Sequence, residues 1–365
     1  MERYVGLDVH SKQSVYVCQD RDGAVVGRGR FATTTDGLAT MARELMLTKG
    51  TKVALETGCQ ANWVAGELGT LGLEALVIEA GEVRAKARRV GQKTDERDAF
   101  ELCDGLRRGI YSSRVFVPEA GLQRLRRAVS RRRHFVRVTT QQINAAKFVL
   151  RSRGIATTRL VLTCAQGWQR LLERENLKPM HEHLRLHFGV WSLAAAHVEG
   201  LEKEIVEALG PYRDIAECLR TCPGVGLVTA ATFIAVIAAP RRFATSAQVV
   251  SYLGLAPSVY ASGEREHRGG LTKRGSSELR WVLVEDAHQA RRPTHPLHPY
   301  YARIAAAEDR KRAAVAVAQR LARILWRMWR DETAFDLNKL NIIHAPRVAR
   351  KKLHYQLKET TMKTT

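Results

Sequence analysis

The apolar residues of this chain change their spacing along its length, and these changes predict its elements. Near the N-terminus they form short runs typical of strands, at residues 3–9, 14–19 and 24–32. From Thr35 to Lys49 they follow the spacing of an amphipathic helix. The same patterns then predict a strand at 52–57, a helix at about 61–72, a strand at 73–79, a basic helix at 81–91 and a helix that bears Asp95 and Asp98. This order indicates an α/β domain whose sheet starts antiparallel and ends parallel.

The chain after residue 119 has a more helical character. Over 119–210 glycine and proline become sparse and strand patterns disappear, which indicates long helices in an antiparallel hairpin or a coiled coil. A mostly helical unit follows and closes with a helix predicted from about Tyr300 to Asp331. We therefore predict domains at 1–118, 119–212 and 213–331, followed by a basic C-terminal tail at 332–365.

Four carboxylates in the first hundred residues end apolar runs or share a helix face: Asp8, Glu56, Asp95 and Asp98. The element order matches the ribonuclease H-like pattern, in which acids from the first strand, the fourth strand and a late helix meet at one sheet edge. Converging carboxylates repel one another unless a cation lies between them, so they suggest a divalent metal site. The alternative, that the helix acids only complement a helix dipole, leaves Asp8 and Glu56 unexplained. Glu96 should face away, and His10 lies either beside the site or on the open surface.

The charge balance indicates a polyanionic partner. Lys and Arg number 59 against 37 Asp and Glu, which gives a net charge of +22, and nucleic acid is the usual partner that offsets such self-repulsion. A membrane is the competing partner, but the longest apolar run, Val225 to Ala239, is shorter than the roughly 20 residues of a spanning helix. The N-terminus does not resemble a signal peptide and the six cysteines are scattered, so we expect reduced thiols and a cytoplasmic location.

Basic residues are concentrated in two segments suited to contact nucleic-acid backbones. One is the predicted helix at 81–91, and the other holds seven arginines between residues 124 and 137, with few acids to pair them. A solvated charged surface is the alternative. The candidate contacts are Arg84, Arg88, Arg89, Arg126, Arg127, Arg131, Arg132 and Arg133.

A glycine-containing turn in the later unit is a further candidate contact. Pro223-Gly224-Val225-Gly226 lies between two helical stretches and resembles the turn of a helix–hairpin–helix element. Gly224 and Gly226 would let backbone N–H groups approach a phosphate at the start of the second helix. An ordinary helical turn with a glycine cap is an equally good interpretation from the residues alone.

A Ser-Gly loop followed by closely spaced cations is the second chemical signal. Ser262-Gly263 precedes four basic residues: Arg268, Lys273, Arg274 and Arg280. A serine there is able to attack a phosphodiester while the cations stabilise the developing phosphorane charge. The alternative is a loop that grips phosphate and in which Ser262 only donates a hydrogen bond.

The ordered set of motifs resembles that of the DEDD-type insertion-sequence transposases, insertion-sequence family one-ten, which are related to Piv-type DNA invertases. The resemblance covers nearly the whole chain. It rests on Gly6-Leu7-Asp8-Val9-His10, Leu55-Glu56-Thr57-Gly58, Asp95-Glu96-Arg97-Asp98-Ala99, Pro223-Gly224-Val225-Gly226, Leu253-Gly254-Leu255-Ala256-Pro257, Ser262-Gly263, Lys273-Arg274-Gly275 and Leu279-Arg280.

The resemblance implies a RuvC-like first domain whose four acids hold Mg²⁺, or alternatively Mn²⁺, at the scissile phosphate. It implies that Ser262 is the nucleophile, forming a covalent phosphoserine link to DNA from a helical transposase domain. Implied partners are donor and target DNA, a non-coding bridge RNA, and further copies of the chain, as a dimer pairing to a tetramer. The implied location is the bacterial cytoplasm, near the nucleoid.

Three other functions are alternatives to this one. A hydrolytic metal nuclease of the RuvC or junction-resolvase type would use the same acids with water as the nucleophile. An actin-like ATPase also opens with Gly-Leu-Asp, but Val9-His10-Ser11-Lys12 stands where such folds place an early glycine. A non-catalytic RNA-binding protein would explain the charge but not the acids.

Overall fold

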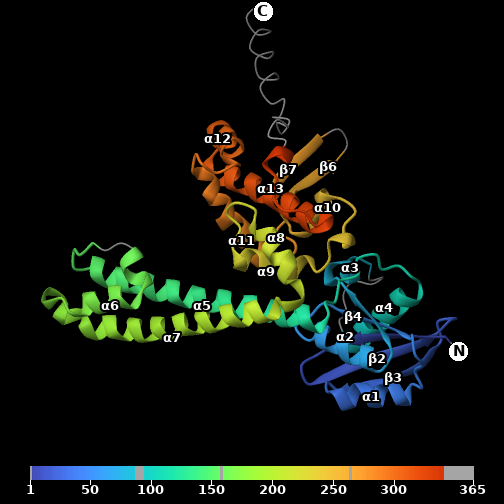
Figure 1. The fold of residues 1–365 in the computed structure, drawn as a ribbon. Helices are drawn as coiled ribbons and strands as arrows, with labels where there is room; N and C mark the ends of the chain where they lie inside the picture. The colour runs from blue at the N-terminus through green and yellow to red at the C-terminus, as the bar shows by residue number, and fades with distance from the viewer. Residues whose placement is uncertain (1, 87–93, 157–158, 263–264, 341–365) are drawn as a thin grey trace, which may run out of the picture. The chain divides into compact units, whose positions relative to one another are not determined.

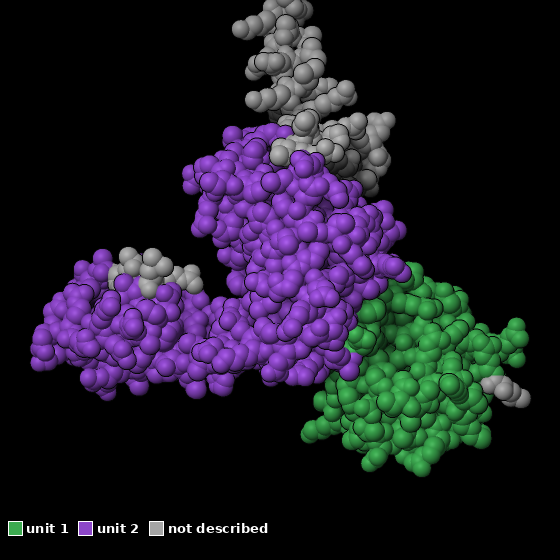
Figure 2. All heavy atoms as spheres, viewed as in Figure 1, with its two compact units in different colours: residues 1–119 green, residues 120–365 purple. Residues whose placement is uncertain are grey.

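The computed structural model describes residues 2–86, 94–156, 159–262 and 265–340. The chain divides into two compact units, residues 1–119 and 120–365, which Figure 2 shows in different colours. Among the described residues, no helix combines the length and the apolar character that a membrane span requires.

The first unit is built on a five-stranded sheet (Figure 1). Its strands are β1 (Arg3–Asp8), β2 (Gln13–Asp20), β3 (Val25–Ala32), β4 (Lys52–Glu56) and β5 (Glu74–Ile78). They lie in the order β3-β2-β1-β4-β5; the first three are antiparallel, and β4 and β5 run parallel to β1. The predicted antiparallel start and parallel finish are confirmed, and this order is consistent with a ribonuclease H-like domain.

Four helices belong to this unit: α1 (Thr35–Glu44), α2 (Ala61–Thr70), α3 (Ala80–Lys86) and α4 (Asp95–Arg107). The prediction of a helix up to Lys49 was wrong, because Leu45 caps α1 and Met46 adopts a φ of 44°. The predicted basic helix at 81–91 begins as α3, and its residues after Lys86 lie outside the described part of the chain.

The sheet is covered by helices on both faces. Residues of α1 and α2 such as Leu38 and Leu68 pack with Leu7 and Leu55 in one apolar core. On the other face, α4 packs Leu102 against Ala54 in a second core. Neighbouring positions of β4 therefore point to opposite cores, as strand geometry requires.

Strand β1 and helix α4 approach each other closely at Gly6. A Cβ atom at this position would overlap Ala99 O and the backbone nitrogen of Cys103 on α4. Ala99 and Cys103 are fully buried, so the helix has no room to retreat. Asp8 lies two residues beyond Gly6, and Asp95 opens the helix one turn before Ala99. The absent side chain therefore sets the distance between the two elements that carry the acids.

The second unit begins with a long two-helix arm (Figure 1), in which α5 (Ala120–Arg151) lies beside α7 (His181–Ala208). Three ion pairs join them: Arg124–Glu207, Arg131–Glu204 and Arg132–Glu202. Along these pairs the residue numbers increase on α5 and decrease on α7, so the two helices run antiparallel, which confirms the predicted antiparallel hairpin. Near the turn of the arm, α6 (Ala165–Leu172) contributes the fully buried Trp168, whose Nε1 donates to Leu162 O at 3.0 Å.

The rest of the second unit is a helical lobe with one hairpin. Its elements are α8 (Arg213–Arg220), α9 (Leu227–Ile237), α10 (Ser246–Tyr252), β6 (Pro257–Ser262), β7 (Arg265–Leu271), α11 (Ser277–Ala287), α12 (His298–Ala307) and α13 (Arg310–Asp331). The single closing helix predicted from Tyr300 to Asp331 was wrong. The side chain of Asp309 accepts hydrogen bonds from the backbone N–H groups of Lys311 and Arg312, so it caps a new helix and separates α12 from α13.

We predict that Gly6→Ala lowers the free energy of unfolding by about 3 kcal/mol, because the added methyl forces the α4 backbone away from β1. Chemical denaturation of the full chain measures this change. Gly66→Ala is the matched control, since nothing lies within 4 Å of a Cβ at that exposed position of α2. That variant should be unchanged or gain about 0.5–1 kcal/mol. Equal stability of the two variants would contradict the role given to Gly6.

Candidate functional site

Two of the predicted acids leave the sheet at the same edge. Asp8 is the last residue of β1 and Glu56 is the last residue of β4. These strands are parallel neighbours, and Leu7 pairs with Leu55. Asp8 and Glu56 each come directly after this pair. The parallel arrangement thus places the backbones of Asp8 and Glu56 at neighbouring strand ends, and the role of Glu56 as a metal ligand stays a prediction.

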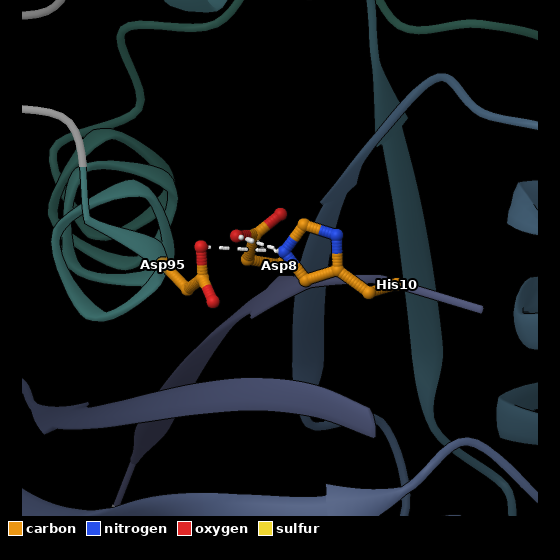
Figure 3. Close-up of side chains that lie close together, drawn as sticks. All are labelled: Asp8, His10 and Asp95. Carbon is orange, nitrogen blue, oxygen red and sulfur yellow. Dashed lines mark hydrogen bonds and ion pairs between the residues drawn. The ribbon is translucent and has the colours of Figure 1, made fainter. Parts of the chain in front are cut away.

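Asp8, His10 and Asp95 form a compact cluster at this edge (Figure 3). His10 Nε2 lies 3.0 Å from Asp8 Oδ2 and 3.5 Å from Asp95 Oδ1. One ligand atom from each residue lies within 4.8 Å of the others. His10 thus lies beside Asp8 and Asp95 and is also exposed on the surface, so the structure joins the two positions expected for it. A signal for this was present in the sequence, since His10 lies two residues beyond Asp8, just past the end of the strand.

The start of α4 places the remaining acids. Thr94 caps the helix by accepting a hydrogen bond from the backbone nitrogen of Arg97, which orients the first turn. The pKa of Asp8 is raised by burial of its carboxyl group and further by the charges of Asp98 and Asp95, against the lowering effect of His10. Asp98 is therefore an electrostatic neighbour of Asp8. Glu96 is exposed and lines a separate cavity with Arg28 and Phe100.

The donor set fits a hard divalent cation. Carboxylate oxygens are the ligands that Mg²⁺ prefers, and an imidazole nitrogen beside them is compatible with Mn²⁺. Burial is the main cause of the raised pKa of Asp8, and the charges of Asp98 and Asp95 add to it; a cation bound there would offset those charges. The side chain of Asp8 is 18% exposed, whereas those of His10 and Asp95 are about half exposed. The cluster is therefore open to solvent on the side of His10 and Asp95.

The second candidate, Ser262, is the last residue of β6 rather than part of the flexible loop that the sequence predicted. Its backbone pairs with Arg265 of β7, and the register continues through Tyr260 opposite His267. Gly263 and the side chains of residues 259–268, including those of Ser262 and Arg268, lie outside the described part of the structure. The short second strand is rich in charge and glycine, which hid its strand character.

The base of this hairpin is fastened by backbone contacts. Arg280 Nη1 donates to three carbonyl oxygens: Leu253 O at 2.9 Å, Gly275 O at 3.0 Å and Arg274 O at 3.2 Å. Gly254 has a φ of 65° and Gly275 a φ of 90°. A Cβ at either glycine would overlap a backbone oxygen of the opposing loop. Arg280 therefore has an internal role that its prediction as a nucleic-acid contact did not anticipate.

The arginines of the arm also divide into two groups. The premise that few acids pair them was wrong, because Glu202, Glu204 and Glu207 reach them from α7, some seventy residues or more along the chain. The guanidinium of Arg126 turns inward, and its Nε donates to Ala235 O at 2.6 Å. This residue supports the junction of α5 with α9, and we leave it out of the proposed nucleic-acid surface.

Other predicted contacts remain on the surface. Exposed basic side chains are those of Arg84, Arg127, Lys273 and Arg274. Arg133 is half-buried, with its guanidinium 5.4 Å from the ring centroid of Trp281. Arg88 and Arg89 lie outside the described residues. These positions stay predictions as nucleic-acid contacts.

The predicted glycine turn links α8 to α9. Gly224 has a φ of 87°, and Gly226 precedes α9 with an extended backbone and no side-chain cap. Asp286 of α11 lies behind this turn, where burial raises its pKa to about 7, against the lowering effect of a hydrogen bond with Thr229. This backbone fits both interpretations of the turn, the helix–hairpin–helix turn and the ordinary glycine cap. The turn is backed by an aspartate that is partly protonated near neutral pH.

Comparisons with known proteins match both units. Residues 5–153 match a family model described as a transposase, DEDD_Tnp_IS110, and residues 216–302 match the model described as the IS116/IS110/IS902 transposase family. The chain is 26% identical over 361 residues to the transposase for insertion sequence element IS1328 of Yersinia enterocolitica, covering 91% of this chain and 98% of that protein. It is 29% identical over 302 residues to the putative transposase y4qE of Sinorhizobium fredii, covering 80% and 73%.

We predict that Arg280→Met loosens the base of the hairpin, because three carbonyls lose their charged donor. Stability should fall by about 1–3 kcal/mol, and amide hydrogen exchange over residues 253–275 should accelerate. Arg274→Met is the matched control, since its exposed side chain lies in the same loop and only its backbone oxygen is engaged. If Arg280→Met left exchange unchanged but weakened nucleic-acid binding, the original sequence prediction would stand instead.

The raised pKa of Asp286 predicts a stability penalty that grows with pH. The folded protein holds the carboxyl proton up to about pH 7, whereas the unfolded chain releases it near its ordinary value of about 4. Unfolding is therefore increasingly favoured by this group as the pH rises from about 4 to 7. Asp286→Asn should remove a penalty on the order of a few kcal/mol above pH 7. The measurement is urea denaturation at several pH values. The control is Glu173→Gln, an exposed acid that does not act on Asp286. Parallel curves for wild type and Asp286→Asn would refute the prediction.

Proposed function

The chain belongs to the IS110/IS116 family of insertion-sequence transposases, and from this membership we infer that it cuts and rejoins DNA at the ends of an insertion sequence. The observation that carries the proposal is the cluster of Asp8, His10 and Asp95 at the sheet edge where Glu56 also emerges. The family favours strand transfer over the hydrolytic nuclease, although both would use this cluster.

The first unit would act by holding a divalent cation at the scissile phosphate. Asp8 and Asp95 are the proposed ligands, with Glu56 and Asp98 completing the set. A bound cation supplies charge neutralisation at the phosphate and makes a coordinated hydroxyl more acidic. Gly6 keeps β1 and α4 close enough for their acids to share one cation. His10 bridges both carboxylates and is suited to hold them in place before the cation binds.

Ser262 is the proposed nucleophile. Its Oγ would form a bond to phosphorus while the bond from phosphorus to one deoxyribose oxygen breaks, and the departing oxygen takes up a proton as a free hydroxyl. The serine proton passes to a base, for which His267 is a candidate. Attack by a second DNA hydroxyl reverses these steps and frees the serine. Each step exchanges one phosphoester for another, so rejoining needs no external energy source.

The proposed partners rest on the charge and on the family. A net charge of +22 suits binding of DNA and of a non-coding bridge RNA. Pairing with a guide would read the sequence, while the protein contacts backbone and shape. Arg127 and Arg133 on the arm, with Lys273 and Arg274 beside the hairpin, are the proposed backbone contacts. We further propose a dimer that pairs to a tetramer, so that the acids of one copy complete the serine site of another.

We predict that Ser262→Ala abolishes strand cleavage and the covalent protein–DNA adduct. Electrophoresis of labelled DNA under denaturing conditions detects both products. Ser258→Ala is the matched control in the same strand, because Ser258 Oγ only donates to Gly270 O at 2.9 Å. Asp8→Asn should also abolish cleavage while nucleic-acid binding is retained. Cleavage by Ser262→Ala at near wild-type rate would replace the serine mechanism with the hydrolytic one.

A further inference from the structure

A cavity of about 440 Å³ opens beside the turn between α8 and α9. One wall is the turn itself, and the other is the segment that connects α11 to α12. The lining residues are Pro223, Gly224, Gln289, Arg292, Thr294, His295 and Pro296. Two segments about seventy residues apart in sequence thus form one cavity. Among these described lining residues, Gly224 is the one predicted site residue.

His295 joins the two walls. Its Nδ1 accepts a hydrogen bond from the backbone nitrogen of Leu297 at 3.1 Å, and its Nε2 lies 3.2 Å from Pro223 O. Because Nδ1 acts as an acceptor, the ring proton lies on Nε2, which donates to Pro223. Both nitrogens are therefore used in the neutral form. The neutral imidazole therefore links the two walls and adds no charge to the cavity.

The charge of the lining favours an anion. Arg292 is the one formally charged side chain in the wall, and no carboxylate lines the cavity. Three other cavities of similar size each include at least one Asp or Glu. Arg292 is exposed and forms no ion pair within the described part of the chain. The acid behind the turn, Asp286, directs its side chain to a hydrogen bond with Thr229.

The neutral groups of the lining also suit a phosphate. The hydroxyl of Thr294 and the side-chain amide of Gln289 are donors of the kind that contact phosphate oxygens in protein–nucleic-acid complexes. Gly224 presents backbone instead of a side chain at the mouth of the cavity, and its φ of 87° is one that other residues rarely adopt.

We propose that this cavity holds a backbone phosphate of a nucleic acid, with Arg292 as its charged donor and Thr294 and Gln289 as neutral donors. The site rests on the proposed function, since it requires a nucleic-acid partner, but it does not require catalysis. The phosphodiester is common to DNA and RNA, and the experiment distinguishes these two sources.

The test measures how the affinity of the full chain for a DNA duplex and for an RNA hairpin depends on salt concentration. Arg292→Gln should reduce the slope of log affinity against log salt by about 0.7–0.9, the value for one phosphate contact. Arg291→Gln is the matched control: it removes the same charge one residue away, where the Nε atom donates to Tyr301 Oη at 3.2 Å. Arg292→Lys should keep most of the slope, because the charge is retained. Thr294→Val should weaken binding about threefold to tenfold with the slope unchanged.

The proposal is overturned if Arg292→Gln binds as the wild type does, or if Arg291→Gln loses as much slope. A reduced slope with only one of the two probes supports the proposal and identifies DNA or RNA as the source of the phosphate. The proposed function fails separately, if Asp8→Asn and Ser262→Ala still cleave DNA. A wild-type slope for Arg292→Gln alongside loss of cleavage in those variants would remove the cavity site and leave the transposase intact.

Discussion

Backbone contact between β1 and α4 at Gly6 is the constraint on which the first unit depends. The strand carries Asp8 and the helix carries Asp95 and Asp98, and neither element has a side chain between them at this point. A larger residue would overlap the α4 backbone and push the helix away from the strand. The carboxylates would then lie farther apart, and the charges of Asp98 and Asp95 would add less to the effect of burial on the pKa of Asp8.

Local patterns were sufficient to predict most of the first unit. Apolar runs marked all five strands, and the acids at their ends indicated the sheet edge where Asp8 and Glu56 emerge. The errors lie where a single residue ends an element, as at Met46 and Asp309, because a continuing apolar pattern conceals a local cap. The hairpin of β6 and β7 was not predicted for a related reason. The residues of β7 are mostly charged or glycine, so they do not show the alternation of apolar and polar residues that is typical of a strand.

Long-range partners could not be predicted from the same patterns. The glutamates that pair with the arm arginines lie on a different helix, and only the antiparallel register of α5 and α7 brings them together. Arg126 and Arg280 belong to dense basic segments, yet both donate to carbonyl oxygens within the second unit. Net charge thus describes the molecule as a whole, whereas the role of each arginine depends on which backbone oxygens the fold places near it. The position of His10 could not be predicted, because the sequence does not determine the path of the chain after β1.

Contacts at the base of the β6–β7 hairpin restrict which substitutions this part of the protein can accept. Gly254 and Gly275 each face a backbone oxygen of the other's loop, and Arg280 ties both loops together. A substitution at any one of these three positions would therefore disturb contacts between the same two loops. Of the two described glycines of β7, Gly269 faces the Oγ atom of Ser258 and Gly270 has nothing within 4 Å of a Cβ, so neither would overlap a backbone oxygen. New nucleic-acid contacts can therefore arise along β6 and β7 by single changes, while the frame that presents the end of the hairpin stays the same.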